Sequence, residues 1–280
     1  MSSYGYARCS AEFPPLDPVP KPDETPGQVE LPRGFNDFAI KYRLNYAGSC
    51  WLPVRSDFFT CGGPRMRWIP LESNPDVMNN FIRELGVKEP MRFVDVFGTD
   101  PDMQALVPGP ILSLLLLYPL TENAKKNVIG TISMDEKCFF MKQTISNACG
   151  TVAILHALAN NVSALDLDSL PWLRKFLEKA HNSTPKERAE ILENEEELSG
   201  VHENCAHQGQ TEAPDPSSQI NLHFVAFVNS GDGRCEGPIL HGKTSPDTFL
   251  ADACKVVDQF MQRDPDNVNF SLMALTNVDG

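Results

Sequence analysis

The sequence predicts an α+β fold in which a central, mainly antiparallel sheet is flanked by helices. Helix and strand signals alternate between residues 75 and 275. The apolar run at residues 111–118 is too short to span a membrane and is typical of a buried central strand. A helix start follows at Thr184, which acts as the cap, with Pro185 at the first helical position and Glu187 at the third.

The other elements follow from the spacing of apolar residues. Apolar residues three or four positions apart indicate a helix, whereas alternation or a short apolar run indicates a strand. The polar stretch at residues 200–218 has Gly and Pro but no period, which predicts a loop. We expect helices at residues 75–85, 173–179, 185–196 and 247–262, and strands at residues 93–97, 112–117, 138–142, 222–228 and 269–275.

One further helix is predicted at residues 151–160, directly after Cys149. We expect Asn147 to cap it, which places Cys149 in the first turn, where the helix dipole and free N–H groups favour a thiolate. Gln143, six positions earlier, could donate an amide N–H to an oxyanion forming beside the sulfur. A lone helical cysteine is more often a small buried hydrophobe, so this thiol hydrolase hypothesis needs a partner base.

A candidate base is His223, on the alternating segment at residues 221–228. A thiolate nucleophile uses an imidazole that can lie far away in sequence. Asp232, in a Gly-Asp-Gly-Arg turn, offers a carboxylate that could orient the imidazole. Cys149, His223 and Asp232 together suggest a catalytic triad.

Five sequence words carry a resemblance to a known family: RWIPLESNP, FVDVFG, FMKQTISNACG, GQTEAP and PILHG. Across about residues 66–278 the chain resembles the ubiquitin C-terminal hydrolases of the short, single-domain type. This resemblance implies a papain-like arrangement of the site and a knotted backbone. It also implies a thiol-dependent ubiquitinyl hydrolase that cleaves small adducts or short peptides from the C-terminal glycine of ubiquitin.

The resemblance assigns roles to single residues. Cys149 is then the nucleophile, His223 the general base, Asp232 its orienting acid and Gln143 the oxyanion-hole residue. No metal or organic cofactor is needed for this chemistry. The polar stretch at residues 200–218 corresponds to the family's crossover loop, which limits the leaving groups that can pass; its candidate gating residues are His202, Glu203, Cys205 and Gln210.

The His223–Asp232 interval departs from the family pattern. The two residues are only nine positions apart, roughly six fewer than in the family, which leaves room for one strand and a tight turn. An alternative is therefore a ubiquitin-binding module with a crippled triad. A general papain-like protease is a third hypothesis, which a restrictive loop over the cleft disfavours.

Residues 1–65 have no counterpart in the short family members. Prolines are frequent in residues 1–33 and apolar residues are scattered, a composition that predicts a largely disordered extension. Residues 66–280 then form the catalytic domain, and Met66 could itself serve as its start.

Charge and cysteine usage restrict the partners. The net charge of −13 argues against nucleic acid and suits a basic partner such as the arginine-bearing tail of ubiquitin. Whether ubiquitin-like modifiers also bind is left open. Eight cysteines without CxxC spacing, and no signal peptide, predict free thiols in a cytoplasmic monomer that is not membrane-bound; the nucleus is left open as a second compartment.

Overall fold

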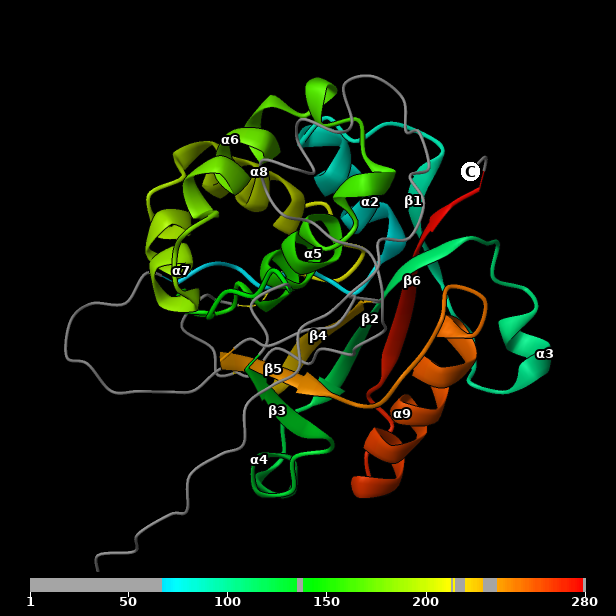
Figure 1. Ribbon diagram of the computed structural model, residues 1–280. Helices are drawn as coiled ribbons and strands as arrows, with labels where there is room; N and C mark the ends of the chain where they lie inside the picture. Colours follow the sequence, from blue (N-terminus) through cyan, green and yellow to red (C-terminus); the bar gives the residue numbers. More distant parts are fainter. Residues whose placement is uncertain (1–66, 135–137, 213, 215–219, 229–235, 279–280) are drawn as a thin grey trace, which may run out of the picture. The chain divides into compact units, whose positions relative to one another are not determined.

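A four-stranded antiparallel sheet lies at the centre of the described chain (Figure 1). The structure is a computed structural model, and it describes residues 67–134, 138–212, 214, 220–228 and 236–278. The strand order is β1-β6-β2-β4, so β4 is an edge strand, and every neighbouring pair is antiparallel. A separate antiparallel pair is formed by β3 and β5. The strands are β1 (Met91–Asp95), β2 (Ile111–Pro119), β3 (Thr131–Met134), β4 (Leu222–Val228), β5 (Glu236–Leu240) and β6 (Ser271–Asn277).

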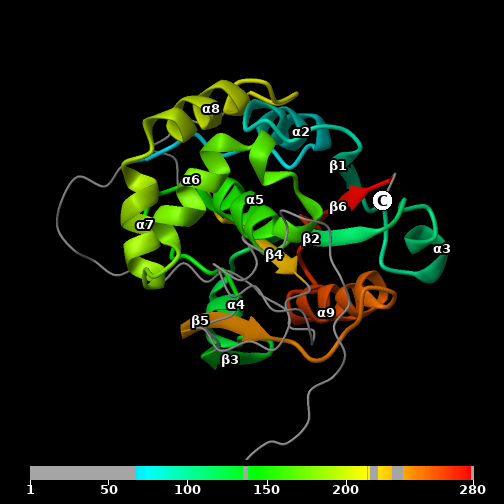
Figure 2. The ribbon, with the colours of Figure 1, turned by 45° about the horizontal axis from the view of Figure 1, so that its top comes forward.

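Helices cover both faces of this sheet, which confirms the predicted fold class (Figure 2). Side chains alternate along β4: Phe224 and Ala226 pack into the core on the α5 side, and Val225 and Phe227 into the core on the α9 side. The first core receives helices α2 (Pro75–Glu84), α5 (Cys149–Ala159), α6 (Pro171–Ala180) and α8 (Glu196–Ala206), and the second receives α9 (Phe249–Arg263).

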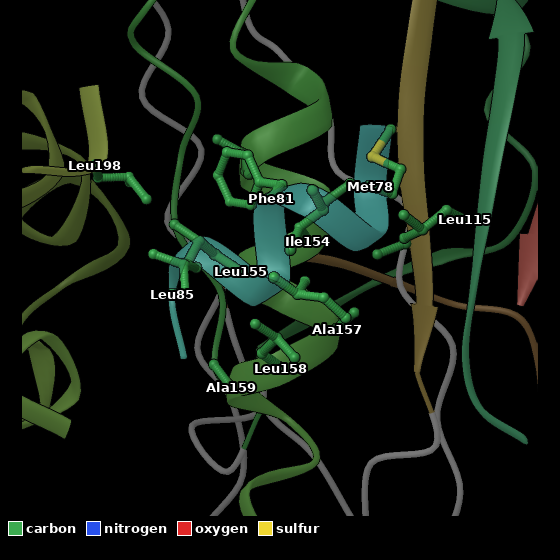
Figure 3. Close-up of a cluster of buried hydrophobic side chains, with 14 of the residues drawn as sticks. Met78, Phe81, Leu85, Leu115, Ile154, Leu155, Ala157, Leu158, Ala159 and Leu198 are labelled. Carbon is green, nitrogen blue, oxygen red and sulfur yellow. The ribbon is translucent and has the colours of Figure 1, made fainter. Parts of the chain in front are cut away.

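The helix that begins at Cys149 lies in the middle of the first core. Every residue of α5 is buried, as expected for a mainly apolar helix, and the buried set includes the polar Thr151 and His156. Figure 3 shows Ile154 and Leu155 of α5 among Phe81 of α2, Leu115 of β2 and Leu198 of α8. Contact on all sides fixes the position of α5, and therefore of the cysteine at its start.

The predicted helix start at Thr184 is confirmed. The Thr184 hydroxyl accepts a hydrogen bond from the Glu187 N–H (3.3 Å), and the Glu187 carboxylate accepts one from the Thr184 N–H (2.7 Å). These reciprocal bonds form a capping box. None of the helices in the described ranges is long and apolar enough to cross a membrane. The shorter elements are α3 (Pro101–Gln104), α4 (Glu122–Lys126), α7 (Pro185–Glu193) and the 3₁₀ turns Val162–Ala164 and Leu167–Ser169.

The predicted strand at residues 138–142 was wrong. Its backbone pairs with side chains instead of a neighbouring strand: the Phe139 N–H donates to the Asn160 side chain (2.9 Å), and the Met141 N–H to Nε2 of His156 (3.0 Å). Local side-chain acceptors thus replace a ladder, which sequence periodicity does not reveal.

One further prediction needs correction, and another cannot be compared with the described residues. The helix predicted at residues 185–196 is two helices, and α8 extends to Ala206 through the first part of the predicted loop. The predicted extension at residues 1–65 lies outside the described residues.

Candidate active site

Cys149 is the first residue of α5, which confirms its predicted place in the first turn. The predicted cap was wrong, because Ala148 occupies the cap position and makes no side-chain cap bond. Asn147 instead has a left-handed backbone (φ 64°), a conformation that Asn tolerates better than most residues. Its side-chain amide donates to the Trp68 carbonyl oxygen (3.0 Å). The turn into α5 is thus tied to the 67–69 segment.

The sulfur of Cys149 is buried between α5 and β4. The side chain is 9% exposed, and this burial raises the pKa of the Cys149 thiol. Backbone N–H groups of Phe224, Gly150 and Cys149 donate to the sulfur and oppose the rise. The N–H groups expected at the helix start are present, but burial outweighs them. The thiol therefore needs a base to become a nucleophile.

His223 lies on β4, the strand on which the first turn of α5 packs. It directly precedes Phe224, whose N–H contacts the Cys149 sulfur. The His223 side chain is 5% exposed and meets the Tyr118 ring edge-on, with ring centroids 6.0 Å apart and planes at 82°. Tyr118 is opposite His223 in the β2–β4 register. The sheet therefore fixes His223 near the start of β4, opposite Tyr118 of β2.

Gln143 lies on the segment that leads into α5. Its Nε2 donates one hydrogen bond to the Ile145 carbonyl oxygen (3.0 Å). Its buried Oε1 has no hydrogen-bond partner within the described ranges. A primary amide has a second N–H, which gives the group a further donor for an incoming oxygen. Asp232, the fourth predicted site residue, lies outside the described residues.

Three of the candidate gating residues are on a helix, not a loop. His202, Glu203 and Cys205 belong to α8, and the His202 and Cys205 side chains are buried in or beside the core. Their predicted place in a loop was wrong, because the buried residues of this stretch recur at helical spacing. Burial and the charge of Glu84 raise the pKa of the Cys205 thiol to about 11, which makes it unreactive. Gln210 is exposed, in a turn beyond α8.

Glu72 holds this turn, and sequence reasoning missed the contact. Its carboxylate accepts hydrogen bonds from the Thr211 N–H (2.9 Å), the Thr211 hydroxyl (2.5 Å), the Gln210 N–H (3.2 Å) and the Asn74 side chain (3.0 Å). Gly209 lacks a side chain here, and a Cβ would meet Glu72 Oε2 at 2.7 Å. Burial raises the pKa of Glu72, but the bonds from Thr211, Asn74 and Gln210 outweigh it and lower the pKa to about 2. One hint of this contact was present in the sequence: Glu72 and Thr211 both lie in sequence words shared with the family.

Replacing Glu72 with glutamine is expected to lower the free energy of unfolding at pH 7 by about 1–2 kcal/mol. The amide would put an NH₂ group against donors that now bind a carboxylate oxygen. Urea unfolding at pH 7 measures the loss. Glu190→Gln, which changes an exposed carboxylate paired with Lys186, is the matched control and should stay within about 0.5 kcal/mol. Equal losses in both variants would contradict the contribution of this contact.

The comparisons with known proteins agree with this arrangement. Residues 68–262 match the family model described as ubiquitin carboxyl-terminal hydrolase, family 1. A ubiquitin carboxyl-terminal hydrolase of Aplysia californica is 46% identical over 208 residues, covering 71% of this chain and 97% of the relative. Human ubiquitin carboxyl-terminal hydrolase isozyme L1 is 39% identical over 222 residues, covering 75% of this chain and 98% of the relative.

A solved structure shows the same fold. The UCH37 catalytic domain of Trichinella spiralis, bound to ubiquitin vinyl methyl ester, matches with a TM-score of 0.59 and 20% identity, covering 75% of this chain and 95% of that one.

The chain thus has a cysteine at the start of a buried helix and a histidine on a strand of the adjoining antiparallel sheet, the two residue types that a cysteine peptidase needs. The chain belongs to ubiquitin carboxyl-terminal hydrolase family 1 and is a deubiquitinating cysteine hydrolase. Among the described residues, no group of three or more His, Cys, Asp or Glu side chains could hold a metal ion.

Proposed function

We propose that this hydrolase cleaves small adducts or short peptides from the C-terminal glycine of ubiquitin through a thioester on Cys149. The observation that carries the proposal is the place of Cys149, buried at the start of α5 where that helix packs on β4, the strand that bears His223. It supports His223 as the base for a thiol that burial keeps protonated. The family match at residues 68–262 supports the same substrate class.

In the proposed mechanism, His223 takes the Cys149 proton, and the sulfur attacks the carbonyl carbon of the terminal glycine. The oxyanion accepts hydrogen bonds from the Gln143 amide and from the Cys149 backbone N–H. His223 then protonates the leaving amine, and water hydrolyses the thioester. Asp232 is the proposed orienting acid for His223, on the strength of the family resemblance.

Ubiquitin is the proposed partner, and ubiquitin-like modifiers are candidates for the same site. The net charge of −13 favours capture of a basic tail, and the Trichinella relative was solved with a ubiquitin derivative bound. We place the hydrolase in the cytoplasm, with the nucleus as a second compartment, because a nucleophilic thiol stays reduced there.

A ubiquitin probe with a C-terminal electrophile tests the proposal. The full chain should form one covalent adduct, and peptide mass spectrometry should locate it on Cys149. An adduct on another cysteine would refute the assignment of Cys149. Ubiquitin binding without any adduct would favour the binding module with a crippled triad.

Replacing Gln143 with alanine is expected to lower kcat about 10²-fold and to leave KM nearly unchanged, because the amide would act on the oxyanion and not on the bound substrate. Hydrolysis of a fluorogenic ubiquitin amide measures both constants. The matched control is Gln262→Ala, at an exposed position of α9 on the other side of the sheet. A Gln143→Ala enzyme with unchanged kcat would exclude Gln143 from the oxyanion hole.

A further inference from the structure

His202, which the gating prediction misplaced, uses both ring nitrogens in the protein interior. Its Nε2 lies 2.6 Å from the Ile69 carbonyl oxygen, and its Nδ1 lies 2.7 Å from the Thr151 hydroxyl. A carbonyl oxygen only accepts, so Nε2 must carry the proton and Nδ1 must accept from Thr151. Burial lowers the pKa of His202 to about 4, although the Ile69 carbonyl opposes this, so the ring is neutral near pH 7. Its two partners therefore fix a single tautomer.

These two partners belong to the parts of the chain that surround the nucleophile. Thr151 is in the first turn of α5, two residues after Cys149. Ile69 belongs to the 67–71 segment, and the His202 ring also packs on Trp68 of that segment, with centroids 4.2 Å apart. One side chain of α8 thus joins the catalytic helix to the 67–71 segment.

The 67–71 segment in turn holds the residues just before Cys149. The Trp68 N–H donates to the Ser146 carbonyl oxygen (3.0 Å), and the Asn147 side chain donates to the Trp68 carbonyl oxygen (3.0 Å). The segment also lies directly on the first turn of α5. A Cβ on Gly150 would come within 3.2 Å of Leu71 Cβ.

We propose that the Thr151–His202 pair positions Cys149 by locking the first turn of α5 against the 67–71 segment. His202 and Thr151 touch no reacting atom, so they are positioning residues and act through the turn at Ser146 and Asn147. The inference rests on the proposed function for its kinetic consequence. Its structural consequence, the order of the 67–71 segment, is independent of the proposed function.

The test compares two replacements of one side chain. Thr151→Val keeps the shape and removes the hydroxyl, whereas Thr151→Ser keeps the hydroxyl and removes a methyl group. We expect Thr151→Val to lower kcat for a ubiquitin amide about tenfold at unchanged KM, and Thr151→Ser to change kcat less than about twofold. A residue with only a packing role would give the opposite order, because the serine variant leaves the larger void.

A second readout does not depend on activity. Amide hydrogen exchange of Trp68, which donates to Ser146, should become about tenfold faster in Thr151→Val and stay unchanged in Thr151→Ser. Unchanged exchange in Thr151→Val overturns the inference, and so does a serine variant slower than the valine variant. If the wild-type protein does not react with the ubiquitin probe but the two variants show the expected exchange pattern, the proposed function alone is refuted.

Discussion

Replacing Cys149 with alanine is expected to lower turnover of a ubiquitin C-terminal amide about 10⁴-fold or more, because no other group could form the acyl intermediate. Ubiquitin affinity should stay nearly unchanged. The side chain is only 9% exposed, so it offers little surface to a bound protein. Alanine keeps the start of α5 and removes only the sulfur. The expected variant therefore binds substrate but does not turn it over.

Two measurements establish this result: steady-state hydrolysis of a fluorogenic ubiquitin amide, and calorimetric titration with ubiquitin. The matched control is Cys254→Ala, which removes a buried thiol from α9 on the opposite face of the sheet. Burial and the charges of Asp258 and Asp100 raise the pKa of Cys254 to about 12, so this thiol should contribute nothing to turnover. An active Cys149→Ala enzyme would contradict the thioester mechanism.

Strong periodicity made most of the main sheet and its helices predictable. The strand at residues 222–228 was predicted with the bounds that β4 has, and the helix at residues 75–85 matches α2 within one residue. In both segments the buried face agrees with the local pattern. By contrast, β3 and β5 were missed. They are short, and within the described ranges they pair with each other alone; the outward Ile132 of β3 is 62% exposed.

The helix α8 was predictable in principle. Its buried residues Leu198, Val201, His202 and Cys205 have the spacing of one helix face. A histidine occupies one of these positions and Gly200 lies among them, so the sequence of this stretch resembles a polar loop. A buried polar residue interrupts the apolar pattern by which a helix is recognised in a sequence. The burial of His202 is favourable because it hydrogen-bonds with Thr151 and Ile69, and these partners are known only from the fold.

The same distinction between local patterns and long-range contacts applies to the site. Local sequence predicted Cys149 at a helix start and His223 on a strand, because both placements depend on neighbouring residues. The contacts of Glu72 with Thr211 and of His202 with Ile69 join residues more than a hundred positions apart. No local pattern encodes such pairs, so only the folded chain shows them.

Acidification between pH 6.5 and about 4 is expected to unfold the protein, because three buried or largely buried histidines resist protonation. Burial lowers the pKa of His156 to about 3, with a further decrease from the charge of Arg188. Burial also lowers the pKa of His202 and of His241 to about 4. Their ordinary pKa is 6.5, so below that pH the unfolded chain binds protons that the folded chain refuses. Stability is complete above pH 6.5 and is lost as the pH falls toward the folded values.

If unfolding takes up three protons, the free energy of unfolding falls by about 4 kcal/mol for each pH unit of acidification within this window. A stability of about 5–15 kcal/mol would then be exhausted over a few pH units, near or above the range where carboxylates titrate. Urea unfolding at pH values between 7.5 and 5 measures the slope.

Replacing His156 with glutamine removes one of the three titrating groups and supplies an oxygen that can accept from the Met141 N–H, as Nε2 does now. Below pH 6 the free energy of unfolding of the His156→Gln variant should therefore change with pH about a third less steeply, by about 3 kcal/mol per pH unit. A wild-type slope near zero between pH 6 and 5 would show that these histidines take up protons without unfolding. Their burial would then not set the acid limit of the fold.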